Sequence, residues 1–322
     1  MSKSQFLSSC TAGAIDYAAL QLMAGHLVAF PTETVYGLGA DASNPDAVRR
    51  IYEVKGRPTD HPLIVHISNI NSLQVWASEI PDFALKLARD FWPGPMTLVL
   101  KRASEAKDFI TGAQESVAIR IPSNPIALAL LGSFESKGGK GIAAPSANRF
   151  GQVSPTSPAD VLTELSNHLK TGDLVIEGGY CEVGIESTII DCTNTSPSVL
   201  RPGGITKAMI KKSIGLVDFV DMKETIRVSG ALEKHYSPRA KVILDMIPKI
   251  GQGLIALSDI PTPNGVIRIA APDSIQEFAQ ILYRSLRMVD EFNLSEVVVV
   301  LPVGEGLEIG IRDRLSKAAQ GR

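Results

Sequence analysis

The sequence predicts an α/β fold with two units: a three-layer domain built on a mixed sheet, and a small parallel α/β unit after it. Short β-branched runs alternate with helical stretches over residues 1–216, which is typical of helices packed on both faces of a sheet. The alternation stops over 217–240, and four further apolar runs with two helices follow. We therefore expect a domain over 1–216, a linker over 217–240 and a domain over 241–322.

The first domain opens with a predicted helix over residues 16–26 that leads into a buried strand at 27–30. Asn44-Pro45-Asp46 starts the next helix, because proline in the first turn loses no hydrogen bond, and Gly56 ends it. Further strands are expected at 63–67, 97–100, 117–121, 141–144, 174–177, 187–191 and 198–201, with helices at 81–91, 124–134, 158–169 and 206–214.

The stretch 217–240 lacks a sustained apolar period and contains Gly230 and Pro238, which favours a linker. The apolar runs after it are typical of buried parallel strands. In this second unit we expect strands at 242–245, 253–258, 265–270 and 297–302, with helices at 273–292 and 310–319.

Composition excludes several classes of protein. The 322 residues carry 32 basic and 34 acidic side chains, so binding dominated by a nucleic-acid backbone is disfavoured. No apolar run reaches the roughly 18 residues of a membrane helix, and we expect no membrane association. Three cysteines without C-x-x-C spacing, and no signal-peptide pattern, indicate a reduced, cytoplasmic chain. Five histidines without H-E-x-x-H spacing argue against a zinc enzyme, and we expect no metal-ligating residues.

The run FPTETVYGLGADA (30–42) places hydroxyl side chains, Thr34 among them, at the end of a predicted strand. Such groups can bind a ligand above a sheet, and the glycines allow close approach of the backbone. An ordinary turn with a buried Tyr36 explains the run equally well.

Four cationic or titratable side chains, Lys55, Arg57, His61 and His66, lie within twelve residues around a glycine and a proline. Arginine and lysine in one loop suit a phosphate chain, because arginine offers a bidentate fork and lysine a point charge. A solvated basic face is the alternative. His66 lies in an apolar strand, where a histidine is more often a core residue than a ligand.

Arg120 interrupts an apolar strand, and a buried arginine needs an anion, either a ligand's carboxylate or an internal salt bridge. The run APSANRFGQVSPTSP (144–158) holds rigid hydroxyls, Ser146 and Ser154 among them, that suit a nucleotide or that simply cap the next helix. Ser187 starts one strand and Arg201 ends another.

Familiar nucleophile and phosphate motifs are missing. The sequence contains no G-x-S-x-G elbow and no G-x-x-x-x-G-K-[ST] loop. A set of lysine, arginine, serine and threonine side chains is typical of catalysis by positioning and charge neutralisation, as in transfer at a nucleotide phosphate.

The motifs together resemble a known family. FPTETVYGLGADA, KGRPTDHPLIVHI, FWPGPMTLVL, VAIRIP, APSANRFGQVSPT, EST and LRPG occur in the order and spacing of the YrdC-type domain, over roughly residues 10–215. SGALEKHYSP and GIRDRLSKAA resemble the linker and C-terminal domain of two-domain L-threonylcarbamoyladenylate synthases. The resemblance implies a YrdC-type three-layer domain with a twisted mixed sheet, and a small Rossmann-like C-terminal domain.

The resemblance also implies an activity: L-threonine, bicarbonate and ATP give threonylcarbamoyl-AMP and pyrophosphate. The product supplies the threonylcarbamoyl group on the adenosine next to the anticodon of certain tRNAs, and a separate transferase complex carries out that later step. Mg²⁺ is expected on the ATP phosphates. The implied threonine-binding residues are Thr34, His66, Arg120, Ala144 and Ser187, and the implied ATP-binding residues are Arg57, His61, Ser116, Ser146, Ser154, Arg201 and Tyr236.

We expect Lys55 and Arg57 to be catalytic, by neutralising phosphate or carbamate charge. Two rival interpretations remain open. One is an RNA-binding module of the same fold without catalysis. The other is a carbamoyl-transfer enzyme that shares the YrdC-type domain, which would need additional zinc motifs that this sequence lacks.

Overall fold

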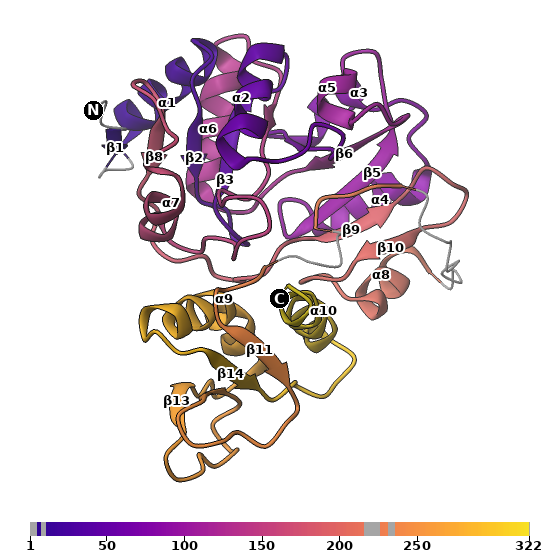
Figure 1. The fold of residues 1–322 in the computed structure, drawn as a ribbon. Coiled ribbons are helices and arrows are strands. Elements are labelled where there is room, and N and C mark those ends of the chain that lie inside the picture. The colour runs from indigo at the N-terminus through magenta and orange to yellow at the C-terminus, as the bar shows by residue number, and fades with distance from the viewer. Residues whose placement is uncertain (1–4, 8–10, 216–225, 231–235, 322) are drawn as a thin grey trace.

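One long sheet forms the centre of the first domain, and helices pack on both of its faces (Figure 1). The computed structural model describes residues 5–7, 11–215, 226–230 and 236–321. Parallel and antiparallel pairs both occur, so the expected three-layer mixed architecture is confirmed. In spatial order the strands are β1 (Gln5–Leu7), β8 (Leu174–Ile176), β2 (Val28–Phe30), β3 (Gly37–Asp41), β7 (Ile142–Ala143), β4 (Ile64–His66), β6 (Ser116–Arg120), β5 (Met96–Lys101), β9 (Thr188–Asp191) and β10 (Ser198–Arg201).

The helices begin and end where the local sequence supplies caps. The Asn44 side chain accepts from the backbone N–H groups of Asp46 and Ala47, and Gly56 ends that helix with φ of 62°, as predicted. The helices of this domain are α1 (Ala12–Met23), α2 (Pro45–Lys55), α3 (Leu73–Trp76), α4 (Asp82–Phe91), α5 (Asp108–Thr111), α6 (Pro125–Ser136), α7 (Pro158–Leu165) and α8 (Lys207–Ile214), with a 3₁₀ turn at Ile70–Ser72.

Different segments cover the two halves of one face of this sheet. At one half, α1 and α6 pack against Phe30 and Ile142. At the other half, Val99 and Ile189 pack against Val228, which belongs to the segment between the domains. The other helices pack on the opposite face, where the largest hydrophobic cluster lies. Polar side chains of the first face therefore have room between its two covered halves.

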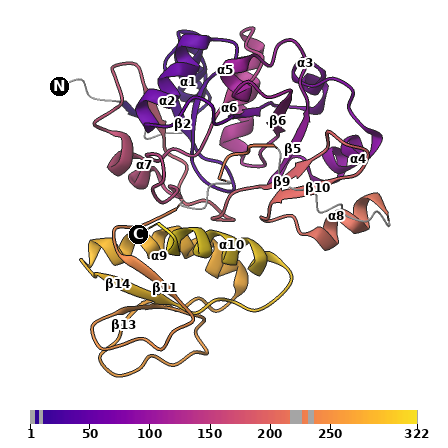
Figure 2. The same cartoon turned by 45° about the vertical axis from the view of Figure 1, so that its right-hand side comes forward.

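The second domain is a four-stranded parallel sheet, as predicted. Its helices, α9 (Ile275–Glu291) and α10 (Leu307–Ala319), lie on the side that faces the first domain (Figure 2). The strands, in spatial order, are β11 (Lys241–Leu244), β14 (Glu296–Val299), β12 (Gly253–Ile255) and β13 (Ile267–Ala270).

The expected linker over 217–240 lies between the end of α8 and the start of β11. Its residues 217–225 and 231–235 lie outside the described part of the chain, and the described remainder, 226–230 and 236–240, contains neither helix nor strand. Across the described ranges, no helix has both the length and the apolar character of a bilayer-crossing segment.

The sequence did not predict β1, β3, α3 or α5, and it placed the end of α7 four residues too late. Strand β3 contains Gly37 and Gly39, and glycine has low strand propensity. Tertiary packing selects glycine here, since a Cβ atom on Gly39 would lie 2.8 Å from the Ile142 side chain and 2.9 Å from the Phe30 ring.

Candidate active site

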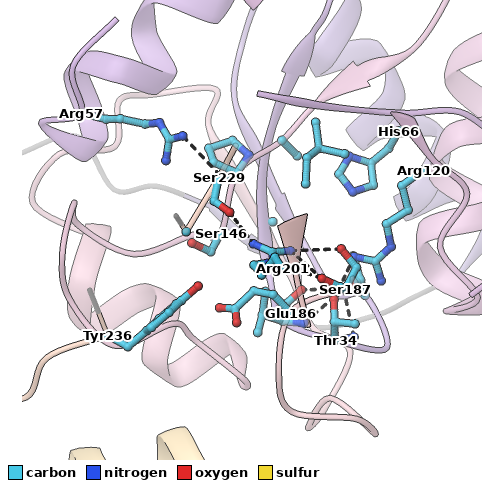
Figure 3. A pocket seen from close by; sticks show the side chains of 17 residues that line it. Thr34, Arg57, His66, Arg120, Ser146, Glu186, Ser187, Arg201, Ser229 and Tyr236 are labelled. Carbon is cyan, nitrogen blue, oxygen red and sulfur yellow. Dashed lines mark hydrogen bonds between the residues drawn. The ribbon is translucent and has the colours of Figure 1, made fainter. Parts of the chain in front are cut away.

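Strand register brings His66 and Arg120 side by side. They are paired positions on the adjacent parallel strands β4 and β6, so both side chains leave the same face of the sheet. Ile142 pairs with His66 across β7 and β4, which places this pair on the face that α1 and α6 cover in part. Both side chains line one cavity (Figure 3).

Most of the expected site residues meet at this cavity, although they come from separate loops and strands. The lining also includes Thr32, Glu186, Ser229 and Gly230, which the sequence analysis did not select. The expected residues that line it are Thr34, Arg57, His66, Arg120, Ala144, Ser146, Ser187, Arg201 and Tyr236, whereas Lys55, His61, Ser116 and Ser154 do not.

Arg120 has an internal anion. Its Nη2 atom lies 2.7 Å from Oε1 of Glu33, and both side chains are buried. Nη1 donates to the Thr34 hydroxyl at 2.9 Å. An internal carboxylate therefore neutralises Arg120, as one of the two interpretations of the sequence expected. The guanidinium also lines the cavity, so it can still contact the carboxylate of a ligand. Glu33 lies within FPTETVYGLGADA (30–42), but the sequence did not indicate it as a site residue. Nothing in the sequence pairs this carboxylate with Arg120, which lies 87 residues further along the chain.

Two further arginines contact the segment between the domains. Arg201 donates from Nη1 to the backbone oxygen of Ser229 at 2.8 Å, and from Nη2 to the backbone oxygen of Ser187 at 2.9 Å. Arg57 donates from Nη2 to the Ser229 hydroxyl at 3.2 Å. Burial lowers the pKa of Arg57 to about 10, which leaves its guanidinium charged at neutral pH. Ser229 thus connects two cations of the cavity (Figure 3).

Glu186 is a buried carboxylate of the cavity with donors from both domains. Ser154 donates to Oε1 at 2.6 Å, while Tyr283 and Arg314 donate to Oε2 at 2.8 and 2.7 Å. Burial would raise the pKa of Glu186, but the charges of Arg314 and Arg201 and the hydrogen bond from Ser154 outweigh it and hold the pKa at about 2. Glu186 is therefore ionised at neutral pH.

His66 is neutral at physiological pH. Burial, together with the charge of the neighbouring Arg120, lowers the pKa of its imidazole to about 3. The edge of its ring packs against Phe30, with centroids 5.9 Å apart. The cavity therefore has an uncharged ring beside a charged guanidinium.

Lys55 supports the loop after β7 from outside the cavity lining. Its Nζ atom donates to the backbone oxygen of Ser146 at 2.6 Å and to that of Asn148. Burial lowers the pKa of this amine well below its usual range, and the charge of Arg57 lowers it further. The sequence-based expectation is that Lys55 neutralises phosphate or carbamate charge, and in this structure its Nζ atom holds backbone oxygens of the chain itself.

The remaining expected residues lie around the cavity. The His61 ring packs edge-on against Phe150, 5.4 Å away, and burial lowers its pKa. Ser116 lines a small adjoining cavity that shares Ile64 and Ser229 with the first. Ser154 is buried against Glu186.

A mixed α/β sheet whose cavity gathers three buried arginines, a neutral imidazole and several hydroxyls defines a class of protein: enzymes that bind anionic small molecules. Residues 21–203 match the Sua5, YciO and YrdC family, described as telomere recombination. Residues 205–320 match the C-terminal domain of threonylcarbamoyl-AMP synthase. The chain belongs to the family of two-domain, Sua5-type threonylcarbamoyl-AMP synthases, which confirms the resemblance seen in the sequence.

Two sequence relatives and one solved structure each cover almost the whole chain. A threonylcarbamoyl-AMP synthase of Pyrococcus abyssi is 38% identical over 95% of this chain and 94% of its own length. One of Bacillus subtilis is 38% identical over 96% of this chain and 93% of its own length. The crystal structure of P. abyssi Sua5 complexed with L-threonine is 35% identical, with a TM-score of 0.88, and covers 99% of this chain and 98% of that one.

Proposed function

We propose that this chain condenses L-threonine, bicarbonate and ATP into threonylcarbamoyl-AMP and pyrophosphate. The observation that carries the proposal is the meeting of Arg57, Arg120 and Arg201 at one cavity of a chain that belongs to this family. Three guanidinium groups suit a ligand set with a carboxylate and a triphosphate.

The threonine end of the cavity is proposed to lie over β4 and β6. Arg120 would hold the amino acid's carboxylate, and Thr34, which accepts from Arg120, fixes the orientation of the guanidinium. His66, Ala144 and Ser187 would enclose the rest of the molecule. A solved relative that holds L-threonine supports this choice of ligand.

The ATP end is proposed to lie toward Arg57 and Arg201. These guanidinium groups meet at Ser229, and Ser146 and Tyr236 line the same region (Figure 3). The adjoining cavity lined by Ser116 would extend this end. His61 and Ser154 are also proposed to contribute to ATP binding, although neither side chain lines the cavity.

The proposed reaction has two steps, a carbamate formation and an adenylate transfer. The neutral amine of threonine attacks bicarbonate, a C–N bond forms, and water leaves to give a carbamate. A carbamate oxygen then attacks the α-phosphorus, the bond from that phosphorus to the bridging oxygen breaks, and pyrophosphate leaves. Arg57 and Arg201 would offset the negative charge that develops on the phosphates.

Exclusion of water is the second contribution proposed for this chain, because both the carbamate and the product hydrolyse. Residues 229–238 are proposed to act as a lid over the nucleotide. Described parts of this segment, Ser229, Gly230 and Tyr236, line the cavity and support that role.

Mg²⁺ is proposed to bind through the ATP phosphates and not through protein side chains, and it would neutralise phosphate charge there. Within the described ranges, no group of three or more His, Cys, Asp or Glu side chains could hold a metal. Glu186, a carboxylate of the cavity, already accepts from three donors. These residues do not fit a metal held by the protein, and we derive no step through one.

The product is proposed to pass to a separate tRNA-modifying transferase complex, within the cytoplasm and without stable nucleic-acid binding by this chain. The test is pyrophosphate release by the purified protein with ATP, bicarbonate and each amino acid in turn. We expect release with threonine and little with the others. Tight RNA binding with no threonine-dependent pyrophosphate would instead support the RNA-binding module.

A further inference from the structure

The C-terminal domain places a buried cation on a carboxylate of the first domain's cavity. Arg314 of α10 donates from Nε to Oε2 of Glu186 at 2.7 Å and from Nη2 to the Glu186 backbone oxygen at 3.2 Å. The Arg314 side chain has no exposed surface, and that of Glu186 is 8% exposed. Such a pair is strongly coupled, because little water screens it.

Glu186 also lies beside Arg201, the arginine that we assign to the nucleotide. Both side chains line the cavity (Figure 3), and each charge shifts the pKa of the other group. Arg201 is bonded to the oxygen of the very next residue, Ser187. Arg314 and Arg201 are the two cations whose charges lower the pKa of Glu186, so without Arg314 the carboxylate would be left with Arg201.

Close packing holds Arg314 in this place. Helix α9 lies against Gly184, where a Cβ atom would be 2.4 Å from the backbone of Gln280. Helix α10 lies against Gly203, whose backbone would be 3.3 Å from a Cβ atom on Gly310. The Arg314 guanidinium also lies over the Tyr236 ring, 5.6 Å from its centroid. These close contacts hold α9 and α10, and with them Arg314, against the first domain.

We propose that Arg314 is a positioning residue for the nucleotide: it engages Glu186 so that Arg201 keeps its positive charge for an anionic substrate. The proposal rests on the proposed function in assigning Arg201 to ATP. In this proposal the C-terminal domain covers the site and also supplies the cation that neutralises Glu186.

The test measures ATP affinity by calorimetry, without threonine or bicarbonate, in three variants. Arg314→Gln is expected to weaken ATP binding at least tenfold, because Glu186 then neutralises Arg201. Glu186→Gln combined with Arg314→Gln is expected to regain most of that loss, since the unpaired carboxylate is gone. Arg314→Lys, which keeps the charge, is expected to bind ATP within about threefold of wild type.

Arg287→Gln is the matched control for loosened domain contact. Arg287 of α9 pairs with Glu164 of the first domain at 2.9 Å but contacts neither Glu186 nor Arg201 through any described hydrogen bond. We expect its ATP affinity to stay unchanged. A loss in this variant equal to that in Arg314→Gln would overturn the proposal, because loosened packing would then explain both.

Two other outcomes would also overturn it. One is an Arg314→Gln variant that melts and binds ATP as wild type does. The other is a well-folded double variant that binds ATP as poorly as Arg314→Gln. If the wild-type chain binds no ATP, the proposed function itself fails; if it binds ATP without this pattern, only the role of Arg314 fails.

Discussion

Arg120 and Glu33 form a buried ion pair of 2.7 Å at the edge of the cavity, between a strand residue and the loop that follows β2. The Glu33 carboxylate also accepts from the backbone N–H of Ser123 at 3.1 Å. The arginine that we assign to threonine is therefore held in place before any substrate arrives. A substrate carboxylate would be its second anion, and the order in the site does not depend on the ligand.

Glu33→Gln should destabilise the fold, because it leaves the Arg120 charge buried without its carboxylate. We expect a loss of about 3 kcal/mol in the free energy of unfolding, measured by urea denaturation. Asp90→Asn is the matched control, since Asp90 pairs with Lys86 on the surface at 3.0 Å and its loss should cost much less stability than that of the buried pair. Equal losses in both variants would contradict the coupling inferred for the buried pair.

Arg57→Ala should lower threonine-dependent pyrophosphate release by a factor of about 100 or more, on the scale of one lost charge-stabilising donor. The melting temperature reports whether the fold is kept. Arg49→Ala serves as control, because Arg49 lies on the preceding helix α2 with its side chain 63% exposed. Release at the wild-type rate from a folded Arg57→Ala protein would remove this residue from the mechanism.

Lys55→Met should act through the loop that follows β7. Its ammonium holds the backbone oxygens of Ser146 and Asn148, and methionine keeps the apolar stem but loses both bonds. We expect faster hydrogen exchange over residues 144–149 together with reduced activity. Lost activity with unchanged exchange in that loop would instead favour the neutralisation of phosphate or carbamate charge that we expect from the sequence.

Stability should fall on mild acidification because of His66. The folded chain protonates this ring only at a pKa of about 3, whereas an unfolded chain does so near 6.5, so the unfolded state binds more protons between these values. The free energy of unfolding therefore falls as the pH drops below about 6.5, with a His66 contribution of about 2 kcal/mol by pH 5.

His66→Gln should flatten that part of the stability profile between pH 7 and pH 5, as measured by urea denaturation at each pH. His168→Gln, at an exposed position, should leave the profile parallel to that of wild type. A His66→Gln protein that loses as much stability as wild type over this range would show that other groups cause the acid sensitivity.

The sequence alone was sufficient to predict the layered α/β architecture, the presence of two domains and most of the helices and strands. Helix α2 illustrates why, because its cap at Asn44 and its stop at Gly56 lie within the segment itself. The same holds for the notice taken of His66 and Arg120 one by one, since each is a polar residue in an apolar strand, whereas their pairing came from the register of β4 and β6.

Only the tertiary structure decided which charges meet. Glu33 neutralises Arg120, Lys55 turns to the backbone of the next loop, and Arg314 crosses from the last helix to Glu186, 128 residues away in sequence. The cause is physical: a strand or a cap is set by neighbours along the chain, whereas the partner of a buried charge is whichever opposite group the packing of distant segments brings within about 3 Å.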